Sequence, residues 1–193
     1  MSTSLINNLK LFNEYDFDNI EISDSSLQPF ISLKPVYIPW SGGRHEHKKF
    51  KKSEVNIVER LVNKLMRPGK AGGKKAHAIA LVRVCFKMIY LQTNQNPVQI
   101  LINAIVNSAP AEDVTTISYG GAAYHVSVDV SPQRRVDVAL RNLTNGARRH
   151  VKKNTIPIEE ALTSELLAAS NNSNSSYAVS KKLEKERIAV SSR

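Results

Sequence analysis

One change of hydrophobic period constrains the fold of this chain more than any other feature of its sequence. Over residues 124–130, YHVSVDV, apolar and polar side chains alternate strictly, and Gly120-Gly121 separates this run from VTTISY. Two alternating runs around a glycine pair predict a β-hairpin, at about residues 114–130, whereas the segments on both sides have helical periods. Since a two-stranded ribbon is barely stable alone, it should lean on the helices or project toward a partner.

Three helices are predicted before the hairpin. In SEVNIVERLVNKLM the apolar residues recur at helical spacing, with Ser53 as the expected N-cap, and residues 67–69 end the helix. The next helix, AHAIALVRVCFKMIYL, is apolar on nearly every face, so we expect it to be the central and most buried one. Asn96 and Pro97 then provide the N-cap and first residue of a helix that Pro110 closes.

Three further helices are predicted after the hairpin. Ser131 and Pro132 begin the helix PQRRVDVALRNLTNGARRHVKK, in which Gly146 leaves a kink possible. Residues 156–157, Ile-Pro, begin the next helix, and the loop NNSNSS follows it. The chain ends in a short helix whose cations we expect to be exposed: Lys181, Lys182, Lys185 and Arg187.

The first fifty residues show no sustained period and contain Pro29, Pro35 and Pro39, which predicts an extended arm. The sequence thus predicts a mainly α fold: a single helical domain of about six helices with an inserted, protruding β-hairpin and an extended N-terminal arm. Residues 1–52 form the N-terminal extension, acidic at its start and basic at its end. Residues 53–193 form the helical domain.

Charge is distributed unevenly along the chain, whose formal net charge is +10. Residues 44–87 hold thirteen Lys or Arg against three acids, and residues 131–153 hold seven against one. Between these blocks, residues 88–130 contain no Lys or Arg. A surface that needs only solubility would be expected to mix both signs, so the two blocks indicate a nucleic-acid partner for the helical domain.

The two basic blocks supply the candidate nucleic-acid contacts. At 100° per residue, most cations of the helix 132–153 fall close to one line, opposite its apolar face. In the arm, His45 and His47 have no third ligand nearby, so RHEHKKFKK predicts phosphate contacts and not a metal site. The candidates are Arg44, Lys48, Lys49, Lys51, Lys52, Arg67, Lys70, Lys74, Lys75, Arg134, Arg135, Arg141, Arg148, Arg149, Lys152 and Lys153.

The run RPGKAGGKKAH, residues 67–77, raises the question of a nucleotide-binding loop. Glycine N–H groups beside lysine can cradle any phosphate, whether it belongs to ATP or to RNA. The Walker motif, however, needs a glycine where Pro68 stands and a hydroxyl where Lys75 stands, and it joins a strand to a helix. The element before this run is predicted to be a helix, so we expect nucleic-acid phosphate here and no ATP hydrolysis.

Other classes of function find little support in the sequence. The five histidines are scattered and no paired carboxylates can be argued, which predicts no catalytic site and no cofactor, and His77 is expected to pack or to contact RNA. Cys85, the only cysteine, lies in an apolar run and is expected in the core. No apolar run approaches the length of a membrane span, and the polar, acidic N-terminus is typical of neither signal nor transit peptides. These features favour the cytosol.

The order of the predicted elements, together with several of their sequences, resembles a known family. The segments VERLVNKLM, GGKK, NPVQILINAIVNSAP, VDVSPQRRVDVAL, NGARR and SSYAVSKKLEKERIAVSSR are similar to the universal small-subunit ribosomal protein number seven, whose eukaryotic members are numbered five. The similarity runs from about Leu27 to Arg193. The arm and the Lys/Glu-rich C-terminus resemble the archaeal and eukaryotic cytosolic branch.

The resemblance implies a structural, non-enzymatic protein of the small subunit in the cytosolic ribosome. It implies a helical fold with a protruding ribbon that binds the 3′ major domain of small-subunit rRNA and supports assembly of the head. Neighbouring small-subunit proteins are implied partners, and the mRNA exit path and the exit-site tRNA should lie nearby. Four positions match family positions that are expected at RNA: Lys74, Lys75, Arg134 and Arg135.

The hairpin departs from the pattern of this family. Relatives usually carry several arginines there, whereas this chain has Thr116, Tyr119, Tyr124 and His125 at the matching places. Because aromatic side chains can stack on bases, Tyr119, Tyr124 and His125 are candidate hairpin contacts. The alternative is that the two tyrosines only pack the ribbon.

Two other functions compete with the ribosomal one. A DNA-binding regulator could place a basic helix in a major groove, and it would discriminate among duplexes. A phosphate-loop enzyme would bind and hydrolyse ATP with magnesium.

Overall fold

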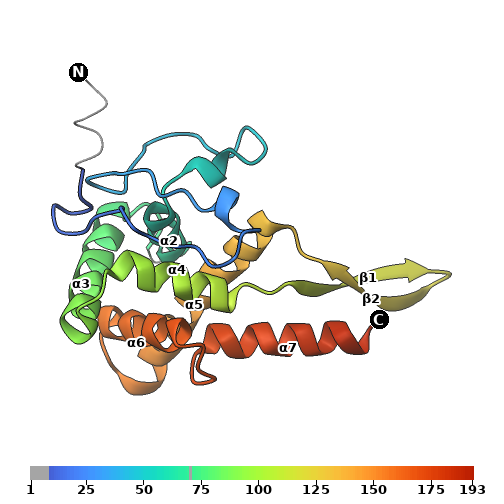
Figure 1. The fold of residues 1–193 in the computed structure, drawn as a ribbon. Coiled ribbons are helices and arrows are strands. Elements are labelled where there is room, and N and C mark those ends of the chain that lie inside the picture. The colour runs from blue at the N-terminus through green and yellow to red at the C-terminus, as the bar shows by residue number, and fades with distance from the viewer. Residues whose placement is uncertain (1–8, 70) are drawn as a thin grey trace.

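The computed structural model describes residues 9–69 and 71–193, which contain six α-helices and one two-stranded sheet (Figure 1). The helices are α2 (Ile57–Leu65), α3 (Lys75–Thr93), α4 (Pro97–Ser108), α5 (Pro132–Asn154), α6 (Ile158–Ser170) and α7 (Tyr177–Ser191). The strands are β1 (Glu112–Tyr119) and β2 (Ala122–Asp129), and short 3-10 helices lie at Gln28–Phe30 and Lys51–Glu54. The predicted mainly α fold of about six helices with one hairpin is confirmed.

Helix α4 lies deepest in the core, where it packs on α5 and α6. Its side chains Val98, Leu101 and Ile105 are fully buried. The prediction that residues 76–91 form the central, most buried helix is therefore wrong, since α3 lies at one side of the molecule and leaves Val84 and Leu91 exposed. The reason is charge: Arg83 and Lys87 of α3 are exposed to water and Lys75 needs an ion pair, whereas α4 contains no charged residue.

Two helix starts test the predicted caps. Asn96 caps α4 as predicted, because its side-chain oxygen accepts a hydrogen bond from the N–H of Val98 (3.0 Å). Ser53 does not cap α2; it lies inside the second 3-10 helix, and Asn56 is the cap. The amide of Asn56 also donates to the carbonyl oxygen of Lys34 (2.8 Å), so the arm determines where α2 begins.

Helix α5 continues through Gly146 without a break, so the kink that the sequence left possible does not interrupt it. The glycine is required by packing instead. A Cβ at this position would lie 2.6 Å from the carboxyl carbon of Glu165 on α6. Glu165 is fully buried and accepts hydrogen bonds from the Ser176 hydroxyl (2.7 Å) and the Ala178 N–H (3.0 Å) at the start of α7. Gly146 therefore makes room for the carboxylate that joins α6 to α7.

The arm is irregular, yet it packs into the same core as the helices. Leu11 and Leu27 are fully buried, and Ile31 is nearly so. Acidic residues of the arm pair with cations of the helices, as Glu14 does with Arg83 on α3 (3.2 Å). The acidic start of the arm therefore lies against the basic helical domain.

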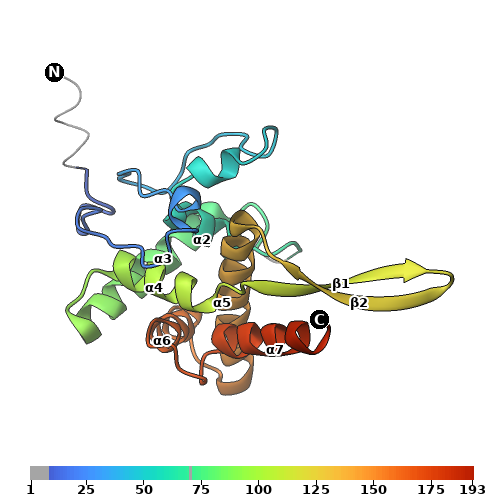
Figure 2. The same ribbon diagram turned by 45° about the vertical axis from the view of Figure 1, so that its right-hand side comes forward.

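The hairpin projects from the helical body (Figure 2). Gly120 and Gly121 have φ of +58° and +82°, as a type I′ turn requires, and the prediction of a tight glycine turn is confirmed. The register pairs Ile117 with Tyr124, which places both on one face of the ribbon. That face continues through Tyr119, Val126 and Val128, and all five side chains are exposed.

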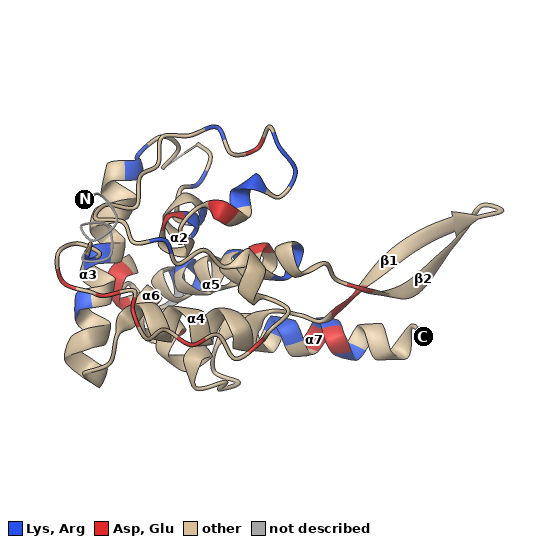
Figure 3. Ribbon diagram, turned by 45° about the horizontal axis from the view of Figure 1, so that its top comes forward, with Lys and Arg blue, Asp and Glu red and all other residues tan. Residues whose placement is uncertain are grey.

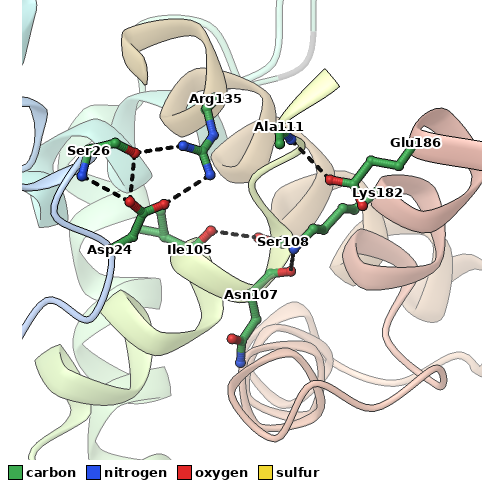
Figure 4. A network of polar contacts seen from close by, with 9 residues as sticks. All are labelled: Asp24, Ser26, Ile105, Asn107, Ser108, Ala111, Arg135, Lys182 and Glu186. Atoms are coloured by element: carbon green, nitrogen blue, oxygen red, sulfur yellow. Dashed lines mark hydrogen bonds and ion pairs between the residues drawn. The ribbon is translucent and has the colours of Figure 1, made fainter. Parts of the chain in front are cut away.

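Helix α7 lies beside the base of the hairpin and holds it. Lys185 pairs with Asp113 on β1 (2.7 Å), and Glu186 accepts the N–H of Ala111 just before it (3.0 Å; Figure 4). Lys182 donates to the carbonyl oxygen at the end of α4, which also appears in Figure 4. The prediction that all the α7 cations are exposed is thus wrong for Lys181, Lys182 and Lys185, which are half-buried, and is confirmed for Arg187.

Candidate nucleic-acid interface

Several predicted contact residues converge in one pocket of about 310 Å³, where the loop after α2 meets the C-terminal half of α5. We call it the α5 pocket. It is lined by Arg67, Asn145, Arg148, Arg149, Lys152 and Tyr177. Four of these six residues are cationic and none is acidic, so the pocket is suited to a phosphate-bearing ligand.

Arg148 is held in the α5 pocket by hydrogen bonds. Its guanidinium donates to the carbonyl oxygens of Lys64 (2.9 Å) and Leu65 (3.0 Å), which end α2, and to the Asn145 side chain (3.1 Å). Burial and the nearby charge of Arg67 lower the pKa of Arg148. Because arginine stays protonated in proteins, the two like charges remain beside each other, and a bound anion would relieve their repulsion.

Arg149 is oriented by an aromatic ring from a different helix. Its guanidinium carbon lies 4.3 Å from the ring centroid of Tyr177, the first residue of α7. This cation–π contact fixes the side chain at the rim of the α5 pocket. No local pattern in the sequence marks Tyr177 as a partner of Arg149, since the two residues are far apart along the chain.

Three predicted contact residues have acidic partners inside the protein. The ion pairs are Lys52–Asp137 (2.6 Å), Lys75–Glu59 (2.6 Å) and Arg135–Asp24 (2.9 Å; Figure 4). Burial acts to raise the pKa values of Glu59 and Asp137, but the paired cations outweigh it and both values lie below their ordinary range. The pKa of Asp24 is lowered by hydrogen bonds from Ser26 and then by Arg135. These three cations therefore stabilise contacts between segments of the fold.

The other candidates that the structure describes take part in no ion pair among residues 9–69 and 71–193. They are Arg44, Lys48, Lys49, Lys51, Arg67, Lys74, Arg134, Arg141, Arg148, Arg149 and Lys152. All are exposed except Lys51 and Arg148, which are half-buried. Lys70 and the side chain of Lys153 lie outside the described residues.

The unpaired cations lie on the arm, on the loop between α2 and α3, and along α5 (Figure 3). A pocket of about 230 Å³, whose lining includes Lys48, Lys49 and the acid Glu46 together with Gln133, brings the arm to the start of α5. The α5 pocket brings Arg67 to the other half of the same helix. Helix α5 thus has unpaired cations from neighbouring segments near both of its ends.

The hairpin differs from this cationic surface. Its ribbon is free of Lys and Arg, and acids lie only near its base (Figure 3). Tyr119 is 81% exposed at the tip, Tyr124 is more than half exposed, and His125 shares a hydrogen bond with Thr116 (3.1 Å). Both tyrosines are accessible for stacking, and the hairpin contacts stay a prediction.

Three exposed aromatic side chains of the arm lie outside the set of contacts predicted from the sequence. Tyr37, Trp40 and Phe50 are each more than half exposed, and the ring of Trp40 lies 5.5 Å from the Lys75 ammonium. Tyr37 and Trp40 lie in the run PVYIPW, which Ser41-Gly42-Gly43 separates from the basic RHEHKKFKK, and Phe50 lies within that basic run.

The structure also bears on the alternative chemistries. The run 67–77 spans the loop after α2 and the first residues of α3, which is not the strand-to-helix context of a Walker motif. Among the described residues, no cluster of three or more His, Cys, Asp or Glu could hold a metal. Cys85 is buried as predicted, and burial raises the pKa of its thiol to about 12, so it stays protonated in the core.

Residues 9–69 and 71–193 include no helix whose length and apolar character would let it cross a membrane.

Comparisons with known proteins identify the kind of chain this is. Residues 31–193 match the family described as ribosomal protein S7p/S5e. Over 185 residues the chain is 46% identical to small ribosomal subunit protein uS7 of Archaeoglobus fulgidus, covering 96% of this chain and 95% of that protein. It is 44% identical over 196 residues to small ribosomal subunit protein uS7 of Nanoarchaeum equitans, covering 96% of this chain and 99% of that protein.

Proposed function

This chain belongs to the ribosomal protein S7p/S5e family, and we propose from this premise that its unpaired cations bind the 3′ major domain of small-subunit rRNA. Membership makes it a structural protein of the small ribosomal subunit and not an enzyme. The phosphate-loop alternative is thereby set aside, and so is the DNA-binding regulator. The archaeal relatives agree with the branch that the sequence resembles.

The α5 pocket is the observation that carries this proposal. Arg67 and Arg148 hold like charges side by side without an acid between them, and Arg149 and Lys152 add two more cations. A protein that bound no polyanion would gain nothing from this repulsion. A phosphate backbone that enters the pocket neutralises several of these charges together.

Binding of this kind recognises the shape of folded RNA. The cations come from the arm, a loop and one helix, so they follow the positions of phosphates in a folded backbone and not the edges of bases in a groove. Each phosphate that is neutralised releases condensed counterions, and affinity should therefore fall steeply as salt rises.

The finer parts of the proposal follow from the same family. The protein would support assembly of the subunit head in the cytosolic ribosome and contact neighbouring small-subunit proteins there. Its projecting hairpin is suited to reach ligands beyond the head RNA, and we place the mRNA exit path and the exit-site tRNA near it.

Sucrose-gradient sedimentation of tagged protein tests the proposal. We expect the protein to move with the small subunit at low salt, and a protein that stays at the top of the gradient at low salt would refute the proposed function. The matching binding experiment uses the double variant Arg67→Gln and Arg149→Gln, which leaves Arg148 to hold the end of α2. Two lost phosphate contacts should lower the slope of log affinity against log salt by about 1.4–1.8 in magnitude.

Arg187→Gln is the matched control for the double variant. Arg187 is exposed on α7, and it lies outside the candidate contact set. The slope of log affinity against log salt for this variant should stay at the wild-type value. Equal slopes for the double variant and for wild type would remove the α5 pocket from the RNA-binding surface.

A further inference from the structure

Trp40 is displayed on the surface in a fixed position. It is the only tryptophan of the chain, and 53% of its surface is exposed. The residue that follows it is tightly held: the N–H of Ser41 (3.1 Å) and its hydroxyl (2.9 Å) both donate to the Glu59 carboxylate of α2. An aromatic ring with few rotatable bonds on a fixed backbone loses little conformational entropy when a flat ligand stacks on it.

Lys75 supports the same ring from the helical domain. Its ammonium pairs with Glu59 (2.6 Å) and lies 5.5 Å from the centroid of the Trp40 ring. One carboxylate thus holds both the backbone beside Trp40 and the cation near its ring. This arrangement explains why Lys75 is buried in an ion pair although the neighbouring Lys74 is exposed.

The charge around Trp40 favours a ligand that is both aromatic and anionic. Lys74 and Arg44 are exposed and unpaired among the described residues, and each lies close in sequence to a residue of this cluster. The arm continues into Lys48 and Lys49, which are also exposed. An apolar protein surface would leave these cations without partners, whereas a nucleotide offers a flat base together with a phosphate.

We propose that Trp40 is a stacking platform for an unpaired nucleobase of the bound RNA. This inference rests on the proposed function and adds a specific mode of recognition to it. Lys75 is a positioning residue that holds the platform, and Lys74 contacts the adjacent phosphate. The arm therefore recognises a single-stranded element of the RNA in addition to the backbone contacts of the α5 pocket.

The single tryptophan makes the inference directly measurable. The full chain is titrated with the transcribed 3′ domain of its small-subunit rRNA while filter binding and tryptophan emission are recorded together. Stacking on a base quenches indole emission, so emission should fall with the same midpoint as binding. Single-stranded oligoadenylate should also quench, and a duplex of the same sequence should quench far less, because its bases are already stacked on one another.

Variants separate stacking from charge and from structure. Trp40→Leu should weaken RNA binding about tenfold, and Trp40→Phe, which keeps an aromatic face, should recover most of that loss. Neither variant removes a charge, so the salt slope should stay at the wild-type value, whereas Lys74→Ala should lower it by about 0.7–0.9. Tyr90→Leu, an exposed aromatic on α3, is the matched control and should bind normally.

The outcomes distinguish this inference from the function on which it rests. If the RNA binds while emission is unchanged, or if Trp40→Leu with a normal melting temperature binds as wild type, the stacking role is wrong and the proposed function stands. If the protein binds no RNA at all, both fail. A Trp40→Leu variant that melts at a lower temperature and is not rescued by Trp40→Phe would show that the ring serves only to hold the arm.

Discussion

Two adjacent lysines, Lys74 and Lys75, are predicted to affect different properties when each is replaced by alanine: Lys75 stability, and Lys74 RNA binding. The sequence presents them as equivalent cations of one loop. In the structure Lys74 is exposed, whereas the Lys75 side chain is 15% exposed and pairs with a Glu59 side chain that is 5% exposed. The first is available to a phosphate, and the second already has a partner.

The magnitudes follow from burial. Lys75→Ala leaves the Glu59 carboxylate buried with only the Ser41 donors, and the loss of one member of a buried pair costs about 3 kcal/mol. In a chain of this size that corresponds to a melting temperature lower by about 6–12 °C. Because Lys75 is already neutralised, the salt slope of RNA binding should change little. Lys74→Ala should lower that slope by about 0.7–0.9 and leave stability within about 0.5 kcal/mol.

Thermal unfolding of the free protein measures stability, and filter binding across a salt series measures the salt slope of RNA binding independently. Both variants are made in the full chain and bound to the same RNA. If Lys75→Ala lowered the salt slope as much as Lys74→Ala while its melting temperature stayed at the wild-type value, the ion pair with Glu59 would not exist in solution, and the assignment of roles would be wrong.

Three further predictions concern the fold. Gly146→Ala should lower the free energy of unfolding by about 1–3 kcal/mol, because its Cβ would overlap the buried Glu165 carboxyl group. In the control Gly72→Ala the new Cβ would have its nearest neighbour at 3.8 Å, so this variant should melt near wild type, and equal melting temperatures for the two variants would contradict the packing. Folding lowers the pKa values of Glu59 and Asp137, so the two ionised carboxylates stabilise the fold at neutral pH. This stabilisation is lost as pH falls below about 4.5 and through the lowered native pKa values, and a melting temperature that stays constant across this range would refute the prediction. Lys185→Ala should speed amide hydrogen exchange in β1 while exchange in α4 stays slow. If exchange in β1 is equally fast in the variant and in wild type, α7 does not hold the hairpin.

The features that the sequence predicted well are those determined by neighbouring residues. The glycine pair 120–121 specifies a turn because only residues that accept positive φ fit it, and the alternation around it specifies two strands. Asn96 caps α4 through the N–H two residues later. The breadth of the basic surface was also predictable, since charge is a property of the composition.

The features that were predicted poorly from the sequence depend on contacts between distant segments. Asn56 replaces Ser53 as a cap because the arm passes beside it, and no local pattern shows where the arm passes. Gly146 left a kink possible in the predicted helix, but the structural reason for the glycine is the carboxylate of Glu165 on the next helix. In the same way, the sequence does not distinguish a lysine that pairs with an acid on another segment from a lysine that faces solvent.

The paired cations lie between segments of the fold, whereas most unpaired candidates are exposed, and this difference has a consequence for folding without RNA. Each ion pair of a candidate contact residue joins two segments: Lys52–Asp137 joins the arm to α5, Lys75–Glu59 joins α3 to α2, and Arg135–Asp24 joins α5 to the arm. A basic chain repels itself when it becomes compact, and acids at the junctions cancel the charge where segments meet most closely. The unpaired cations have no such acidic partner among the described residues, although Lys51, Lys74 and Arg134 directly precede paired ones in the sequence, and solvent and ions screen their charge. Salt should therefore act in opposite directions on the two processes, because it weakens RNA binding steeply while it reduces the repulsion that opposes folding of the free protein.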